Sequence, residues 1–273
     1  MRRVLSTRLF SSERLTTATL GRIERAGFHS VMLYGERWSL DYRQRGRIDE
    51  LRSWFRDSPL DARGLIAPTT SDESGGGAPE DLLRITELDR PRRIKITDEL
   101  KRVLEVADAI PYGSLILTLG SPEELYSDAA FDAAFNALDE LQVMARHLDV
   151  ELVLSNSAND LANADRLRQL LRFTHLPLGY AFDFPAAQAA GDLTREFETM
   201  AENIRVALAA DGDNQRRPRR MPTAEEPVVD WKRGRDLLRQ LNADKTLLAL
   251  DVDPDPETEP LDAALRAFDF LEG

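Results

Sequence analysis

The chain alternates eight times between a short apolar run and a longer segment with helical periodicity. Such alternation is typical of βαβ units and a parallel sheet. Eight units within 273 residues predict an α/β fold, a single (β/α)8 TIM barrel that forms one domain over residues 1–273. A doubly wound open sheet is the alternative, but no phosphate-binding glycine fingerprint follows the first strand. The expected strands are Val4–Phe10, Ser30–Tyr34, Asp61–Pro68, Ser114–Gly120, Val150–Asn156, Leu178–Phe184, Ile204–Asp211 and Lys245–Asp253.

The segments between these runs carry helix signals. Gly27 stands where the first helix should end, and Ser127 is a suitable N-cap for the helix that follows the fourth strand. Helical periodicity after the third strand resumes only at Ile96. Before it, residues 69–81 are rich in Gly, Ser, Thr and Asp, which predicts a flexible loop.

Composition narrows the possible chemistry. The chain has no Cys and 3 His, which excludes thiol nucleophiles and Cys-ligated metals and leaves few imidazole ligands. A formal charge of −12 argues against a nucleic-acid partner. There is no apolar run of transmembrane length and no signal-peptide pattern, so we expect no membrane partner and a cytoplasmic location.

In a barrel of this kind, the active site lies at the carboxyl ends of the strands and in the loops that follow them. Few acidic side chains occupy those positions, and the three histidines all lie at the opposite ends of their strands or helices, where residues serve stability. The acidic candidates are Glu36, Asp183, Asp211, Asp251 and Asp253, and the histidines are His29, His147 and His175.

Several segments, in order along nearly the whole chain, resemble the xylose isomerase-like barrels, the sugar phosphate isomerase/epimerase group that includes endonuclease IV. The similar segments are "ERLTTATLGRIERAGFHSVML", "LDYRQRGRIDELRSWF", "GLIAP", "LVLSNSANDLANADRLRQLL", "YAFDFPAAQAAGDL" and "VVDW". The resemblance implies a barrel that isomerises or epimerises sugars with a divalent metal.

The chain departs from the family at the metal ligands that the resemblance implies. The ligand Glu after the fifth strand falls on Ser155, and the His that partners the conserved Asp183 falls on Ala186. Asn156 is kept, and the last Glu is replaced by Asp251. Asp183 and Asp251 alone would hold a metal weakly, because affinity depends on the number and charge of the ligands. We therefore expect a degenerate member with no metal site and no cofactor.

Three functional hypotheses follow. In the first, the barrel has lost metal-dependent catalysis and acts as a non-catalytic or ligand-binding protein. In the second, it is a metal-independent sugar or sugar phosphate isomerase or epimerase that uses Asp183 and Asp251 as acid and base. In the third, the ligands are misaligned and a metal enzyme remains. For Asp183, a structural role is also open, in which its carboxylate caps a loop or pairs with an arginine.

Arginines recur in the segments after the second, third and seventh strands, and arginine is well suited to binding phosphate or carboxylate groups. This predicts an anionic, sugar-like small molecule as the partner, and the family resemblance implies a possible homodimer. The expected ligand-binding residues are Glu36, Asn156, Arg216, Arg217, Arg219 and Arg220, and the remaining loop arginines are Arg37, Arg43, Arg45, Arg47, Arg90, Arg92 and Arg93.

Overall fold

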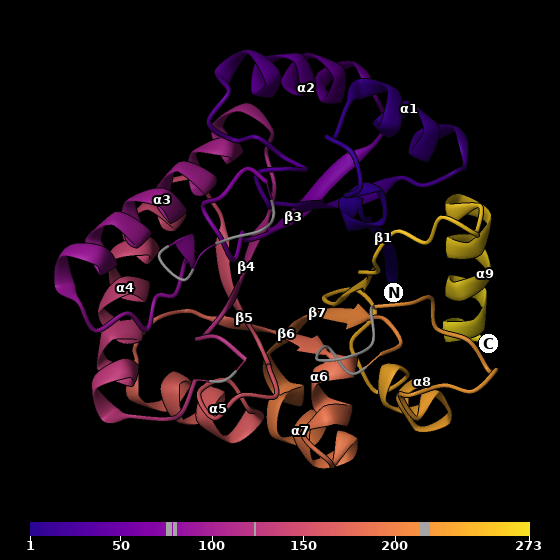
Figure 1. Ribbon diagram of the computed structural model, residues 1–273. Coiled ribbons are helices and arrows are strands. Elements are labelled where there is room, and N and C mark those ends of the chain that lie inside the picture. Colours follow the sequence, from indigo (N-terminus) through magenta and orange to yellow (C-terminus); the bar gives the residue numbers. More distant parts are fainter. Residues whose placement is uncertain (75–77, 79–80, 123, 213–218) are drawn as a thin grey trace.

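The eight predicted strands close into a single parallel barrel, with helices around its outside (Figure 1). The computed structural model describes residues 1–74, 78, 81–122, 124–212 and 219–273. Leu5 lies beside Val31 on one neighbouring strand and beside Leu250 on the other, which closes the sheet. The (β/α)8 prediction is therefore confirmed. The strands are β1 (Arg2–Ser6), β2 (Ser30–Tyr34), β3 (Asp61–Ile66), β4 (Ser114–Thr118), β5 (Glu151–Ser155), β6 (Gly179–Asp183), β7 (Ile204–Ala209) and β8 (Leu247–Leu250).

Side chains along each strand alternate between two apolar layers, because successive residues of a strand point to opposite faces. One layer fills the barrel interior and is made of residues such as Met32, Ile116 and Val153. Their neighbours, such as Leu33 and Leu154, pack outward against the helices. The interior layer forms the floor beneath the open end of the barrel, where the strands end.

The helices begin and end at signals that the sequence carries. The Oγ atom of Ser127 accepts a hydrogen bond from the N–H of Ala130, and Gly27 has a φ of +91°, so both predicted helix boundaries are confirmed. The helices are α1 (Thr17–Arg25), α2 (Arg45–Asp57), α3 (Arg90–Ala109), α4 (Asp128–His147), α5 (Ala164–Phe173), α6 (Phe184–Ala189), α7 (Leu193–Met200), α8 (Trp231–Leu238) and α9 (Pro260–Glu272).

All the predicted strands except Ser30–Tyr34 end earlier in the structure, and in two of them a side-chain cap is the reason. The first was expected to reach Phe10, but Ser6 caps a short 3-10 helix, η1 (Thr7–Phe10), by accepting the N–H of Arg8. The sixth was expected to include Phe184, which instead opens α6. The reason is again a cap, because Asp183 accepts the N–H of Ala186 and Pro185 lies in the first turn. In both places a polar side chain at the strand end starts a turn directly above the barrel.

Thr69 and residues 82–85, which belong to the segment between β3 and α3, lie at the open end of the barrel. Within this segment, Thr70 and Leu82 form an antiparallel β-bridge, which holds these two parts of the segment next to each other. Residues 75–77 and 79–80 of the predicted flexible loop lie outside the described residues. Helix α3 begins at Arg90 rather than near Ile96, because Asp89 caps its first turn. Arg90, Arg92 and Arg93, expected in a loop, therefore belong to a helix.

Within the described residues, no helix combines the length and the apolar character needed to span a membrane.

Candidate functional site

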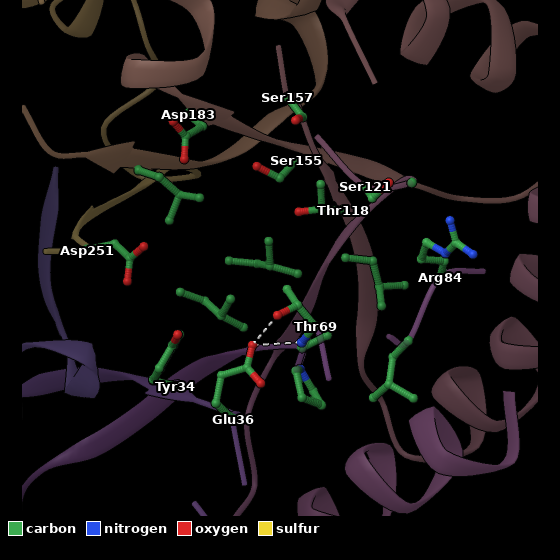
Figure 2. A pocket seen from close by; sticks show the side chains of 18 of the residues that line it. Tyr34, Glu36, Thr69, Arg84, Thr118, Ser121, Ser155, Ser157, Asp183 and Asp251 are labelled. Atoms are coloured by element: carbon green, nitrogen blue, oxygen red, sulfur yellow. Dashed lines mark hydrogen bonds between the residues drawn. The ribbon is translucent and has the colours of Figure 1, made fainter. Parts of the chain in front are cut away.

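A cavity of about 610 Å³ opens at the carboxyl ends of the strands. Isoleucine and leucine side chains such as Ile66, Ile116 and Leu208 form its apolar surface. Figure 2 shows Asp183 and Ser155 on one side of this space, with Glu36 and Tyr34 on the opposite side. The polar lining residues are Arg8, Tyr34, Glu36, Thr69, Arg84, Thr118, Ser121, Ser155, Asn156, Ser157, Asp183, Arg219, Asp251 and Asp253.

Arg219 joins two of the predicted acidic residues. Its Nη1 atom donates to Oδ2 of Asp183 at 2.8 Å, and its Nε atom lies 3.2 Å from Oδ2 of Asp251. The same Nε donates to the backbone oxygen of Asp251 at 2.8 Å. Arg219 is only 6% exposed, and the two aspartates are similarly buried. A fixed positive charge thus stands between two carboxylates that a metal site would need.

Arg8 extends this ionic cluster toward the first strand. Its Nε donates to Oδ1 of Asp253 at 2.6 Å, and its Nη1 lies 3.5 Å from Oδ2 of Asp251. The guanidinium also lies over the ring of Tyr34, 5.1 Å from the centroid. Burial works to lower the pKa of Arg8, but the negative charges of Asp251 and Asp253 raise it above its ordinary value. Arg8 therefore remains charged at physiological pH.

The side chains of Asp183 and Asn156 line the cavity and also form hydrogen bonds with backbone groups. Asp183 accepts the N–H of Ala186 through Oδ1 while Oδ2 accepts from Arg219, so both oxygens are engaged. The amide of Asn156 donates to the backbone oxygen of Asp183 and accepts its N–H at 2.6 Å. Asn156 lines the cavity, but these contacts use its side chain to hold the ends of β5 and β6 together.

Glu36 is buried on the other wall of the cavity, with an exposed fraction of 2%. Its Oε1 atom accepts hydrogen bonds from the backbone N–H of Thr69 at 2.7 Å and from the Thr69 hydroxyl at 2.6 Å (Figure 2). Its Oε2 atom is buried without a hydrogen-bond partner among the described residues. Burial raises the pKa of Glu36 above its ordinary value, although the hydrogen bonds from Thr69 oppose this change.

Glycine places Glu36 at this wall. Gly35 donates its N–H to the backbone oxygen of Ile66 at 2.9 Å. A Cβ atom at Gly35 would lie 2.5 Å from that same oxygen, so the chain can pass this close only without a side chain. The turn after β2 therefore depends on Gly35, and it directs the next residue toward the cavity.

The described residues do not fit a divalent metal ion. They contain no group of three or more His, Cys, Asp or Glu side chains arranged to hold one. Ser155 lines the cavity where the resemblance implies a ligand Glu, and Asp183 and Asp251 are bound to Arg219. All three histidines are exposed, before β2, at the end of α4 and before β6, away from the strand ends that form the cavity.

The predicted arginines separate into different environments. Arg216 and Arg217 lie outside the described residues, whereas Arg219 enters the cavity. Arg220 points elsewhere and pairs with the buried Asp211 at 3.0 Å. Arg37 is buried against Asp41, Glu73 and the backbone oxygen of Ser71, outside the cavity lining.

Arg84 was missed by the sequence analysis. It lines the cavity from the segment between β3 and α3 and lies near Glu87 and Glu124, at 3.3 Å and 3.5 Å. No periodicity or residue spacing in that segment identifies Arg84 as a cavity residue, because its position depends on the tertiary path of the segment. Tyr34 and Thr69 lie at strand ends, where functional residues are expected.

The fold and this site define the chain as a (β/α)8 barrel with a polar pocket at the carboxyl ends of its strands. The family model described as xylose isomerase-like TIM barrel matches residues 20–272. The chain belongs to this family. No curated relative matches it significantly in sequence.

Solved structures with the same fold include sugar epimerases. A D-tagatose 3-epimerase-like protein has a TM-score of 0.75 at 17% identity, covering 100% of this chain and 96% of its own. A 3-keto-D-glucoside 4-epimerase from E. coli has a TM-score of 0.73 at 15% identity, covering 99% and 98%. The IOLI protein with a bound zinc atom has a TM-score of 0.76 at 13% identity, covering 100% and 98%. At these identities, the likeness concerns the fold.

Proposed function

We propose that this barrel binds a small, sugar-like molecule in the cavity and has lost metal-dependent catalysis. The observation that carries the proposal is the contact of Arg219 with both Asp183 and Asp251. A guanidinium in this place neutralises the carboxylates and leaves little room for a divalent ion. The protein would then bind its ligand through hydrogen bonds and apolar contacts alone.

The lining of the cavity supports a polyhydroxylated ligand. Ligand pockets combine an apolar surface with a few convergent polar groups, and this cavity has an isoleucine and leucine floor beneath several hydroxyl groups. Its volume of about 610 Å³ lies in the range of small-molecule sites, roughly 300–1,000 Å³. The sugar epimerases among the structural neighbours point to the same class of ligand.

Charge favours a neutral sugar over the anionic one expected from the loop arginines. Three arginines line the described part of the cavity, namely Arg8, Arg84 and Arg219, together with four carboxylates. Each of these arginines already has a carboxylate within 3.5 Å. An anionic ligand would have to compete with these carboxylates for the arginines. A neutral hydroxyl group can instead accept a hydrogen bond from an arginine or donate one to a carboxylate without replacing the ion pair.

The proposal is tested by measuring binding with and without a chelator. Isothermal titration calorimetry with D-tagatose and D-fructose should give a Kd that EDTA leaves unchanged. The anionic probes D-fructose 6-phosphate and D-gluconate should bind more weakly than these neutral sugars. Thr118→Phe places a large side chain at the cavity and should weaken binding at least tenfold, whereas Ser53→Phe adds similar bulk on the exposed face of α2 and should not. Binding that EDTA abolishes, or no binding of any probe, would contradict the proposal.

A second candidate is a metal-independent isomerase or epimerase with Asp183 and Asp251 as acid and base. Asp251 supports it, because its Oδ1 atom is buried without a hydrogen-bond partner in the described part of the chain. Asp183 is less suitable, since both of its oxygens are engaged. Such an enzyme would exchange the hydrogen next to the ketose carbonyl with solvent deuterium, which proton NMR detects. Exchange that Asp251→Asn abolishes would favour this candidate over a non-catalytic protein.

A further inference from the structure

Tyr34 belongs to the uppermost ring of side chains that point into the barrel. It lies two residues beyond Met32, which fills the barrel interior, and alternate residues of a strand face the same side. Thr118 stands two residues beyond the interior residue Ile116 in the same way, and both Tyr34 and Thr118 line the cavity. Figure 2 shows the side chain of Tyr34 directed into this space, so its hydroxyl group lies at the cavity.

The ring of Tyr34 is held in place before any ligand binds. The backbone N–H of Tyr34 donates to the hydroxyl oxygen of Thr7 at 2.9 Å. The Arg8 guanidinium lies over the ring, 5.1 Å from its centroid. The ring of Trp38 packs edge to face with it, with 6.2 Å between the two centroids. A hydrogen bond from this hydroxyl to a ligand therefore requires little further ordering of the side chain.

The hydroxyl group of Tyr34 lacks a hydrogen bond within the described residues. The contacts of Tyr34 there involve its backbone and its ring, and the hydroxyl is not one of the polar atoms that the fold closes off from solvent. By contrast, the hydroxyl of Tyr112 donates to the backbone oxygen of Val103 at 3.1 Å. A largely buried tyrosine usually has a partner for its O–H group, so water or a ligand in the cavity must supply it.

The phenol of Tyr34 is neutral at physiological pH. Burial raises the pKa of its hydroxyl far above the ordinary value, and although Arg8 opposes this change, Glu36, Asp251 and Asp253 add to it. A neutral phenol both donates and accepts hydrogen bonds, as an alcohol hydroxyl group of a sugar does. A carboxylate or phosphate oxygen would only accept, and it would bring a further negative charge close to these carboxylates.

We propose that Tyr34 determines specificity in this cavity, with its hydroxyl group forming a hydrogen bond to one hydroxyl group of a neutral, sugar-like ligand. The inference rests on the proposed function, because it assigns a contact within the same site. A hydrogen bond between two neutral groups changes affinity by about two- to tenfold. A sugar that lacks the matching hydroxyl loses this bond, and so does a protein that lacks the phenol hydroxyl. Removing both groups should therefore cost no more than removing one.

The experiment is a calorimetric titration with D-tagatose and D-fructose and with analogues of each that lack one hydroxyl group of the six-membered ring form. These are the 1-deoxy, 3-deoxy, 4-deoxy and 5-deoxy sugars and the 2,6-anhydro derivative. Tyr34→Phe should bind the parent sugar about two- to tenfold more weakly than the wild type. It should also lose the preference of the wild type for the parent sugar over one of the analogues. Tyr180→Phe, in a hollow at the opposite end of the barrel, should leave every Kd unchanged.

Thermal unfolding separates a ligand contact from a structural role. Tyr34→Phe removes no hydrogen bond within the described residues, so its unfolding midpoint should equal that of the wild type. Tyr112→Phe removes the bond to the backbone oxygen of Val103 and should lower the midpoint.

Three results would overturn the inference while the proposed function stands. They are a Tyr34→Phe protein that is unstable, one with the Kd of the wild type, and one that still distinguishes every analogue as the wild type does. Absence of binding to both sugars and to all their analogues would instead remove the proposed function, and this contact with it.

Discussion

The guanidinium of Arg219 and the carboxylate of Asp183 form a buried ion pair at 2.8 Å, although the two residues are 36 positions apart in the chain. The same guanidinium reaches Asp251. These contacts join the ends of β6 and β8 through a residue of the segment that follows β7. In this member of the family, an arginine side chain supplies a positive charge at the two carboxylates where the resemblance implies a metal site.

Removing Arg219 should therefore be costly. Arg219→Ala leaves Asp183 and Asp251 without this buried counter-charge, and breaking a buried pair in this way destabilises proteins by about 3–5 kcal/mol. The loss is measured as the free energy of unfolding in urea. Arg239→Ala breaks an ion pair with Asp236 whose side chains are exposed, and it should cost less than about 1 kcal/mol. Equal effects of the two substitutions would contradict the structural role given to Arg219.

Asp211 should be as important for the segment that carries Arg219. It is fully buried, and it accepts hydrogen bonds from the N–H groups of Val228 and Val229 and from the indole of Trp231. Arg220 pairs with it from the other side of the segment. Asp211→Ala should lower the free energy of unfolding by about 3–5 kcal/mol, since several buried donors lose their acceptor.

Arg220→Ala is the matched control for this prediction. It removes the half-exposed partner of the ion pair but leaves the hydrogen bonds that Asp211 accepts from Val228, Val229 and Trp231, so it should cost less than Asp211→Ala. If Asp211→Ala proved as mild as Arg220→Ala, the hydrogen bonds to Val228, Val229 and Trp231 could not be what holds this segment.

Gly35→Ala tests how the wall that carries Glu36 is built. The added Cβ would lie 2.5 Å from the backbone oxygen of Ile66, so β2 and β3 must separate. Overpacking of this kind costs about 1–3 kcal/mol, and the displaced Glu36 should weaken ligand binding as well. Gly46→Ala is the control: its Cβ meets no described atom within 4 Å, and alanine in helix α2 should stabilise by about 0.5–1 kcal/mol. A Gly35→Ala protein with wild-type stability would exclude the close approach.

Glu36→Gln should remove a pH dependence from the stability of the protein. Because burial raises the pKa of Glu36 in the folded state, ionisation at neutral pH favours the unfolded chain. The wild type should consequently gain stability relative to Glu36→Gln as the pH falls from 8 to 5. Thermal unfolding followed by circular dichroism at several pH values measures this difference. An equal change of stability with pH in the two proteins would contradict the burial of an ionisable group here.

The barrel and the location of its site were largely predictable from the sequence. Eight alternations of apolar and amphipathic segments define the strands, and the ends of those strands bring Glu36, Asn156, Asp183 and Asp251 to one cavity. Local sequence patterns were sufficient to predict the strands and the location of the cavity, because the periodicity of a strand or helix can be read from residues that are close together in the sequence. The errors at Ser6 and Asp183 also have a local cause, since both are side-chain caps that shorten a strand.

The partners of these residues were not predictable in the same way. The pairing of Arg219 with Asp183 or Asp251 depends on the path of the segment after β7, which the buried Asp211 organises. Arg84 lines the cavity from the segment between β3 and α3, whose path no sequence periodicity predicts. Such contacts join loops that are distant in sequence. The sequence left open that the Asp183 carboxylate caps a loop or pairs with an arginine, and the structure shows both, but the sequence did not identify Arg219 as the partner.

We infer that the side chain of Arg219, rather than a divalent ion, neutralises Asp183 and Asp251. Elemental analysis of the wild-type protein, purified without chelator and after incubation with Mn²⁺, Zn²⁺ or Mg²⁺, tests it most directly. We expect that no ion binds in a one-to-one ratio with the chain. One tightly bound ion per chain in the wild type, lost in both Asp183→Asn and Asp251→Asn, would contradict it.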